Sequence, residues 1–131
     1  MTILIVDDVP QVVELIRQTI LRSGLVSTRA EDVREAHSVN EARLELLRYR
    51  PDLMILDEVL PGESPLDLLR EPAFFSIPVI LISATAQTSS PTDEARQPRV
   101  LARLPKWGWG DLDRIAGEIR QLASRTPKKS G

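Results

Sequence analysis

The chain has 131 residues, of which 42% are hydrophobic and 27% are charged, so we expect one soluble, globular domain with a single core. With 17 basic and 19 acidic residues the net charge is −2, which argues against a nucleic-acid-binding surface. Cysteine is absent, which excludes disulfides and thiolate metal sites. No apolar run suggests a membrane span or a secretory signal, so we expect a cytoplasmic location.

The first half of the chain alternates strand and helix patterns. Residues 3–6 are all apolar, which is typical of a strand buried on both faces of a parallel sheet. Apolar residues then recur every three or four positions over 11–23, which predicts an amphipathic helix. Residues 33–37 predict a weaker strand at a sheet edge, and Ser38 with Glu41 fits a capping box that begins a second helix.

The second half repeats the pattern with a shorter helix. Residues 53–56 and 79–82 are further all-apolar runs, and residues 100–104 predict a fifth strand. Between the first two of these runs, Ser64 followed by a proline predicts the capped start of a short helix. Asp111 is placed to cap a final amphipathic helix after the fifth strand.

This order of elements predicts an α/β fold. Alternating strands and helices form a parallel sheet with right-handed crossovers. For this length we expect a doubly wound five-stranded parallel sheet of order 2-1-3-4-5 with helices on both faces, the flavodoxin-like arrangement. The domain is expected to span residues 1–125, and the polar residues 126–131 are expected to form a disordered tail.

Polar residues follow the predicted strands at one edge of that sheet. Asp7 and Asp8 follow the first strand and Asp57 ends the third, and these two strands are neighbours about 4.8 Å apart in the predicted order. Ser83 follows the fourth strand, and the long side chain of Lys106, after the fifth, can reach back. A single acid here would be read as a strand cap, but the convergence of these residues makes Asp57 a candidate functional residue.

With these residues in this order, the chain resembles the receiver domain of bacterial response regulators over essentially its whole length. The matched elements are Val6-Asp7-Asp8, Asp57, Leu60-Pro61-Gly62, Ser83-Ala84 and Lys106. The resemblance implies a signalling domain rather than an enzyme, one that assists its own phosphorylation and dephosphorylation. It also implies that Asp57 accepts a phosphoryl group from a phosphohistidine on a sensor histidine kinase or a phosphotransfer protein.

The resemblance further implies a metal ion at the acidic edge, Mg²⁺ or Mn²⁺. Its expected ligands are Asp7, Asp8, Asp57 and the backbone carbonyl of Val59. This agrees with physical chemistry, because a hard divalent cation relieves the repulsion between neighbouring carboxylates and prefers oxygen ligands.

The expected phosphate-binding and switch residues are Ser83, Ala84 and Lys106. The order around Lys106 departs from the family pattern, in which a proline follows the lysine, because here a proline precedes it and Trp107 follows it. Arg103 stands where the family commonly has an aromatic residue, and its charge is not expected to bury in the same way. Output coupling through Arg103 and Trp107 is therefore expected to differ from the family pattern.

Several alternatives stay open. The downstream partner is either a protein target or an output domain outside this chain, with no direct nucleic-acid or membrane contact, and dimerisation is compatible with the sequence. Trp107 and Trp109 either form a docking patch or pack on the last helix. A receiver-like interaction module that does not use phosphate is favoured by the altered order around Lys106 and by Arg103, and opposed by the complete set of acids. A hydrolase with an aspartyl nucleophile is disfavoured, because that class has a second acid two residues after the nucleophile and this chain has Val59 there.

Overall fold

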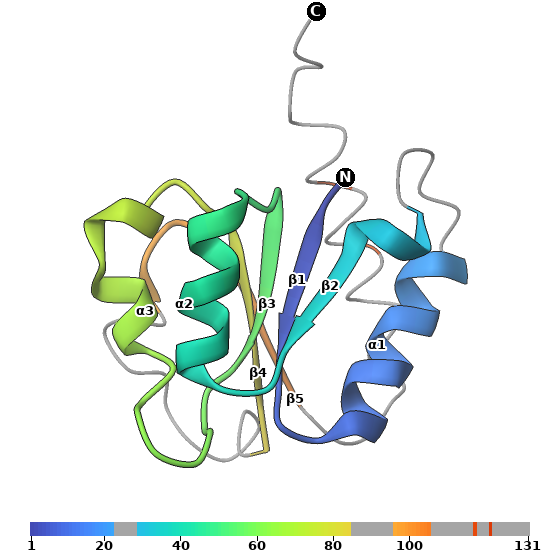
Figure 1. The fold of residues 1–131 in the computed structure, drawn as a ribbon, viewed down its shortest axis with the longest axis horizontal. Coiled ribbons are helices and arrows are strands. Elements are labelled where there is room, and N and C mark those ends of the chain that lie inside the picture. Colours follow the sequence, from blue (N-terminus) through green and yellow to red (C-terminus); the bar gives the residue numbers. More distant parts are fainter. Residues whose placement is uncertain (23–28, 85–95, 106–116, 118–120, 122–131) are drawn as a thin grey trace, which may run out of the picture.

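The computed structural model describes residues 1–22, 29–84, 96–105, 117 and 121. Within them, five parallel strands form one sheet in the order β2-β1-β3-β4-β5 (Figure 1). The strands are β1 (Ile3–Val6), β2 (Val33–Ala36), β3 (Leu53–Asp57), β4 (Val79–Ser83) and β5 (Val100–Pro105). The predicted fold class and strand order are confirmed. Of the predicted final helix only Gly117 and Gln121 are described, and both are helical. The tail at 126–131, Lys106 and both tryptophans lie outside the described residues.

Helices cover both faces of the sheet, as predicted (Figure 1). On one face α1 (Pro10–Arg22) packs its buried valines and isoleucines against alternate residues of the strands, such as Ile5 and Ile55. On the other face α2 (Val39–Arg48) and α3 (Asp67–Arg70) pack against the intervening residues, such as Leu56. Every residue of β1, β3 and β4 is buried, which explains their continuous apolar runs.

Two short 3-10 helices, η1 (Ala30–Asp32) and η2 (Pro72–Phe74), complete the described elements. Among the described residues, no helix is both long enough and apolar enough to cross a membrane.

Of the three predicted helix caps, Asp111 lies outside the described residues, and the other two have different outcomes. The Ser38 hydroxyl accepts the backbone N–H of Glu41 at 3.1 Å, so the predicted cap of α2 by Ser38 is confirmed. The Glu41 carboxylate, expected to close the capping box, accepts a hydrogen bond from the Ser38 hydroxyl at 3.3 Å. The predicted cap by Ser64 is wrong, because α3 begins at Asp67 and has no side-chain cap. Ser64 instead uses its backbone carbonyl, which accepts the N–H of Asp67 at 3.1 Å in a tight turn that precedes the helix.

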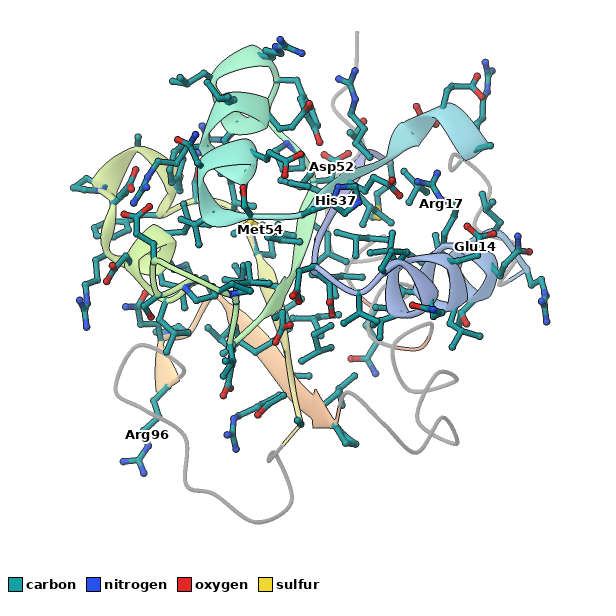
Figure 2. The ribbon with its side chains drawn as sticks, turned by 60° about the horizontal axis from the view of Figure 1, so that its bottom comes forward. Glu14, Arg17, His37, Asp52, Met54 and Arg96 are labelled. Atoms are coloured by element: carbon teal, nitrogen blue, oxygen red, sulfur yellow. The ribbon has the colours of Figure 1, made fainter. Side chains whose placement is uncertain are left out.

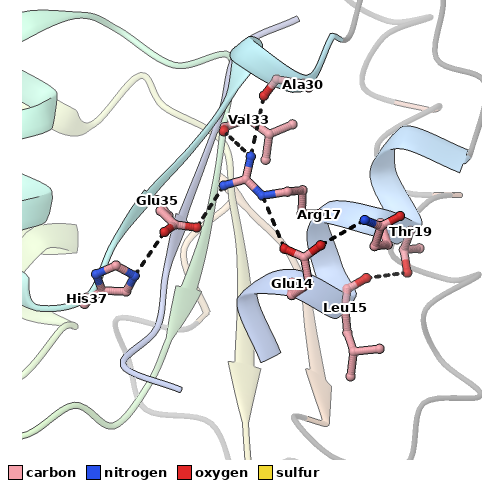
Figure 3. Close-up of polar contacts among 9 residues, drawn as sticks. Glu14, Leu15, Arg17, Thr19, Ala30, Val33, Glu35 and His37 are labelled. Carbon is pink, nitrogen blue, oxygen red and sulfur yellow. Dashed lines mark hydrogen bonds and ion pairs between the residues drawn. The ribbon is translucent and has the colours of Figure 1, made fainter. Parts of the chain in front are cut away.

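Strand β2 forms one edge of the sheet, as predicted, and an arginine from α1 covers part of it (Figure 2; Figure 3). The guanidinium of Arg17 donates to the backbone carbonyl of Val33 at 2.9 Å and pairs with Glu35 at 2.8 Å. Glu35 in turn lies 3.3 Å from the imidazole of His37, just after the strand. These polar contacts cover an edge strand, whose unpaired backbone groups otherwise invite pairing with another chain.

Candidate metal centre at the carboxyl edge of the sheet

Three carboxylates meet where β1 and β3 end. Asp7, Asp8 and Asp57 each offer an oxygen, and these oxygens all lie within 4.8 Å of one another. The register that pairs Val6 with Leu56 brings Asp7 beside Asp57. Asp7 and Asp57 are 0% and 2% exposed, whereas Asp8 is exposed. The cluster therefore has two acids fixed in the protein interior and a third at the surface.

The two buried acids are oriented by their own loops. One oxygen of Asp7 accepts the backbone N–H of Val9 at 2.8 Å, and one oxygen of Asp57 accepts that of Val59 at 3.0 Å. In both cases a carboxylate binds the amide two residues further along, the geometry of an Asx turn. Each acid is thereby held at the sheet edge by a contact that does not depend on a ligand.

The donor set of this cluster fits a hard divalent cation. It consists of carboxylate oxygens only, the ligands preferred by Mg²⁺ and by the chemically similar Mn²⁺. Asp7, Asp8 and Asp57 would hold the ion, and the exposed Asp8 is the acid whose position could adjust most easily. Among the described residues, no second cluster of three such ligating side chains is found.

Two further predicted site residues lie at the end of β4. Ile82 lies opposite Asp57 in the sheet, so Ser83 ends β4 one residue beyond it. Ser83 is buried and Ala84 is exposed. A hydroxyl group and a small side chain thus stand on one side of Asp57, and the other two acids stand on its opposite side. The positions of Lys106 and Trp107 lie outside the part of the chain that the structure describes.

The loop after Asp57 leads away from the site and is anchored at its far end. Val59 is 74% exposed, whereas Leu60 is buried. Gly62 follows with a φ of 90°, a left-handed conformation that suits glycine. Arg43 of α2 then pairs with Glu63 at 2.8 Å and with Glu71 at 2.6 Å, and these two acids raise the pKa of its guanidinium. The loop therefore turns sharply and is tied to α2.

An ion pair that the sequence did not indicate lies next to the acids. Arg103 of β5 makes two contacts with Glu58, the residue after Asp57: Nε to Oε1 at 2.5 Å and Nη2 to Oε2 at 3.1 Å. Only 13% and 10% of the two side chains are exposed. Arg103 was expected not to bury as an aromatic residue at this position would; its largely covered guanidinium is compensated by the Glu58 carboxylate. The two residues are 45 positions apart, so no local pattern could have paired them.

Comparison with known proteins gives one family. A model described as the response regulator receiver domain matches residues 3–106. The phosphate regulon transcriptional regulatory protein PhoB of Pseudomonas aeruginosa is 33% identical over 90 residues, which are 66% of this chain and 37% of PhoB. The chain thus spans little more than a third of that relative's length.

Solved structures share the fold. The response regulator protein TrrA from Thermotoga maritima, in complex with Mg²⁺-BeF, is 22% identical with a TM-score of 0.68, and the match covers 93% of this chain and 99% of TrrA. The Mn²⁺-bound form of response regulator Rcp1 is 21% identical with a TM-score of 0.71, and the match covers 99% of each chain.

Proposed function

The chain belongs to the family of response regulator receiver domains, and from this premise we propose that Asp57 accepts a phosphoryl group in a metal-dependent reaction that switches an interaction surface. The observation that carries the proposal is the meeting of three carboxylates at the end of the central strands. The proposed donor is a phosphohistidine on a sensor histidine kinase or a phosphotransfer protein. In the transfer, the phosphorus–nitrogen bond breaks and a carboxylate oxygen forms the new bond to phosphorus.

Asp57 is the best candidate for the acceptor because of its position in the sheet. It ends β3, the central strand, with Asp7 beyond one neighbouring strand and Ser83 at the end of the other. Of the three acids, Asp57 alone lies between a carboxylate neighbour and a hydroxyl group. A phosphoryl group on Asp57 would therefore have metal ligands on one side and a hydrogen-bond donor on the other.

The proposed metal is Mg²⁺ or Mn²⁺, held by Asp7, Asp8, Asp57 and the backbone carbonyl of Val59. When bound, it would neutralise the repulsion between the acids and the incoming phosphoryl group. Support comes from the all-oxygen donor set and from the Mg²⁺-BeF and Mn²⁺ complexes of TrrA and Rcp1, which share this fold. The exposed Asp8 is the acid that can adjust its position as the ion binds.

The remaining roles are assigned to the phosphate side of the site. The Ser83 hydroxyl would donate a hydrogen bond to the phosphoryl group, and the small side chain of Ala84 would leave room for that group. Lys106 would supply a positive charge. Arg103 and Trp107 are the proposed residues of output coupling. We propose that the domain comprises residues 1–125 and acts in the cytoplasm as a signalling domain that assists its own phosphorylation and dephosphorylation.

The partner downstream is a protein target or an output domain outside this chain. PhoB, a transcriptional regulatory protein, is much longer than the matched region, which supports the second alternative. A receiver-like module that binds partners without phosphate is the competing function. It is favoured by one observation, the ion pair of Arg103 with Glu58 at a position that the family commonly gives to an aromatic residue.

Phosphorylation by acetyl phosphate with Mg²⁺ tests the proposal directly. We expect the intact protein to gain one phosphoryl group, mapped to Asp57 after borohydride reduction, and Asp57→Asn to gain none. The matched control is Asp52→Asn, since Asp52 is an exposed acid just before the same strand, at its opposite end. No incorporation into the intact protein from acetyl phosphate or from a kinase would favour the phosphate-independent module.

A further inference from the structure

The ion pair between Glu58 and Arg103 joins the acceptor loop to the last strand of the sheet. Glu58 follows β3 and Arg103 lies in β5, so the contact passes over β4, which lies between them. Arg103 is in register with Leu81, and Leu81 packs in the core cluster on the α2 and α3 face of the sheet. The pair therefore lies on that face, close to the carboxyl edge that carries the acids.

The geometry of the contact is that of a strong ion pair. Two nitrogens of the guanidinium meet two oxygens of the carboxylate, at 2.5 Å and 3.1 Å, in the parallel arrangement that fixes both partners in orientation. Both side chains are close to nine-tenths buried, so solvent screens the attraction weakly. A paired arginine and glutamate in this setting hold a definite geometry, and removing Arg103 would take from the largely buried Glu58 carboxylate the cation that compensates its charge.

Glu58 lies between Asp57 and Val59, so its position affects the backbone that orients both residues. Its backbone N–H donates to the carbonyl of Ile82 at 2.9 Å, and the next amide, that of Val59, donates to Asp57 at 3.0 Å. The carboxylate of Asp57 is thus oriented by the residue that follows Glu58. The backbone carbonyl of Val59, a proposed metal ligand, belongs to the same short segment.

We propose that Arg103 is a positioning residue that, through its ion pair with Glu58, holds the segment 57–59 in the geometry that binds the metal ion. This inference rests on the proposed function and adds a specific residue to it. Arg103 contacts neither the metal nor the phosphoryl group in this role. It fixes Glu58, and the backbone on either side of Glu58 then presents the Asp57 carboxylate and the Val59 carbonyl together.

The first test uses the metal-free protein in EDTA and follows amide hydrogen exchange by NMR. Arg103→Ala and Glu58→Ala should each speed exchange of the Val59 amide by about tenfold or more, because each removes a charge-assisted contact that holds the segment. The matched control is Arg99→Ala, which removes an arginine just before the other end of β5, where it donates to the carbonyl of Phe74. That variant should leave the Val59 amide unchanged.

The second test measures Mg²⁺ affinity by calorimetry in the double variant Glu58→Ala with Arg103→Ala. This variant keeps the net charge of the protein, which limits the electrostatic contribution to any change in affinity. Outer-shell partners of metal ligands typically contribute 10–100-fold to affinity, so we expect binding roughly tenfold weaker. The exchanged pair, Glu58→Arg with Arg103→Glu, restores the contact and should bring affinity back toward that of the unaltered protein.

The outcomes separate this inference from the proposed function. If the unaltered protein neither binds Mg²⁺ nor accepts phosphate, the proposed function fails, and the exchange measurement still decides the positioning role. If the double variant binds Mg²⁺ as tightly as the unaltered protein, or if Val59 exchange does not respond to Arg103→Ala, the inference is overturned. A lowered melting temperature with unchanged exchange and affinity would also overturn it, since the pair would then contribute stability alone.

Discussion

Asp7 and Asp57 end neighbouring strands and are held by the same local contact, because each accepts the backbone N–H of the residue two positions further along, at 2.8 Å and 3.0 Å. The two carboxylates are therefore fixed side by side before any ligand arrives. The third acid, Asp8, is exposed at the surface, where its side chain can change position more easily. Two rigid ligands and one adjustable ligand suit a site that binds a cation reversibly.

The first prediction concerns stability with and without Mg²⁺. In the metal-free protein, Asp8→Asn should raise the free energy of unfolding by up to about 1 kcal/mol, because it removes one of three carboxylates that repel each other at close range. Mg²⁺ at a hundred times its dissociation constant should stabilise the unaltered protein by about 2.7 kcal/mol. Urea unfolding in EDTA and in Mg²⁺ measures both effects.

The same experiment has a built-in contrast. Asp8→Asn should bind Mg²⁺ weakly and gain little stability from it, whereas Asp52→Asn, at the opposite end of β3, should gain as much as the unaltered protein. Equal stabilisation of all three proteins by Mg²⁺ would show that the ion acts elsewhere than at the acid cluster.

The second prediction uses the two serines that precede helices. Ser38→Ala should lower the free energy of unfolding by about 1 kcal/mol, because the hydroxyl caps α2 by accepting the N–H of Glu41. Ser64→Ala should change it by less than about 0.5 kcal/mol, because Ser64 contributes its backbone carbonyl and the exposed side chain caps nothing. Urea unfolding of both variants measures the difference, and a loss as large for Ser64→Ala would contradict the assigned caps.

The difference between the two serines shows how far local patterns predict this fold. Strands such as Leu53–Asp57 could be identified because burial on both faces demands a continuous apolar run. The alternation of strands and helices predicted a parallel sheet, and the chain length favoured the order 2-1-3-4-5. Ser64 carries the same capping signal as Ser38, but the turn after Gly62 delays the start of α3 until Asp67. Where a helix begins can depend on the loop before it, and the sequence pattern of the helix does not predict that position.

The candidate site divides in the same way. The acids could be predicted because each directly follows a strand whose place in the sheet was known, so topology alone brings Asp7 to Asp57. The pairing of Glu58 with Arg103 could not, because it depends on the direction of two side chains across an intervening strand. Contacts of this kind arise from packing, and charged residues in a sequence give no indication of which opposite charge they meet.

The third prediction concerns the loop after Asp57. Gly62 has a φ of 90°, and a Cβ added there would meet no atom within 4 Å. Gly62→Ala should therefore cost about 1 kcal/mol or more from backbone strain and not from a clash. Gly62→Asn should cost less, because asparagine tolerates left-handed conformations better than alanine does. Urea unfolding measures the loss of stability in each variant. Equal losses in both would mean that the left-handed backbone conformation is not the reason for glycine at position 62.

The fourth prediction concerns Tyr49, the only tyrosine in the chain. Burial, followed by the nearby charge of Glu45, raises its pKa to about 12, while Arg34, which lies 4.6 Å from the ring centre, acts in the opposite direction. In the unfolded chain the tyrosine ionises at its ordinary pKa of about 10. Below that pH the contribution of the neutral phenol to folding stability is fully present. This contribution to stability should be lost as the pH rises from about 10 to about 12.

The absorbance of tyrosinate in the folded protein should therefore titrate above the pKa of free tyrosine. Tyr49→Phe should remove both this absorbance signal and this part of the loss of stability at alkaline pH. Because the Tyr49 hydroxyl is buried without a hydrogen-bond partner in the described part of the chain, Tyr49→Phe should cost little at neutral pH. A titration at the ordinary pKa would mean that the ring is open to solvent and would contradict its packing beneath Arg34.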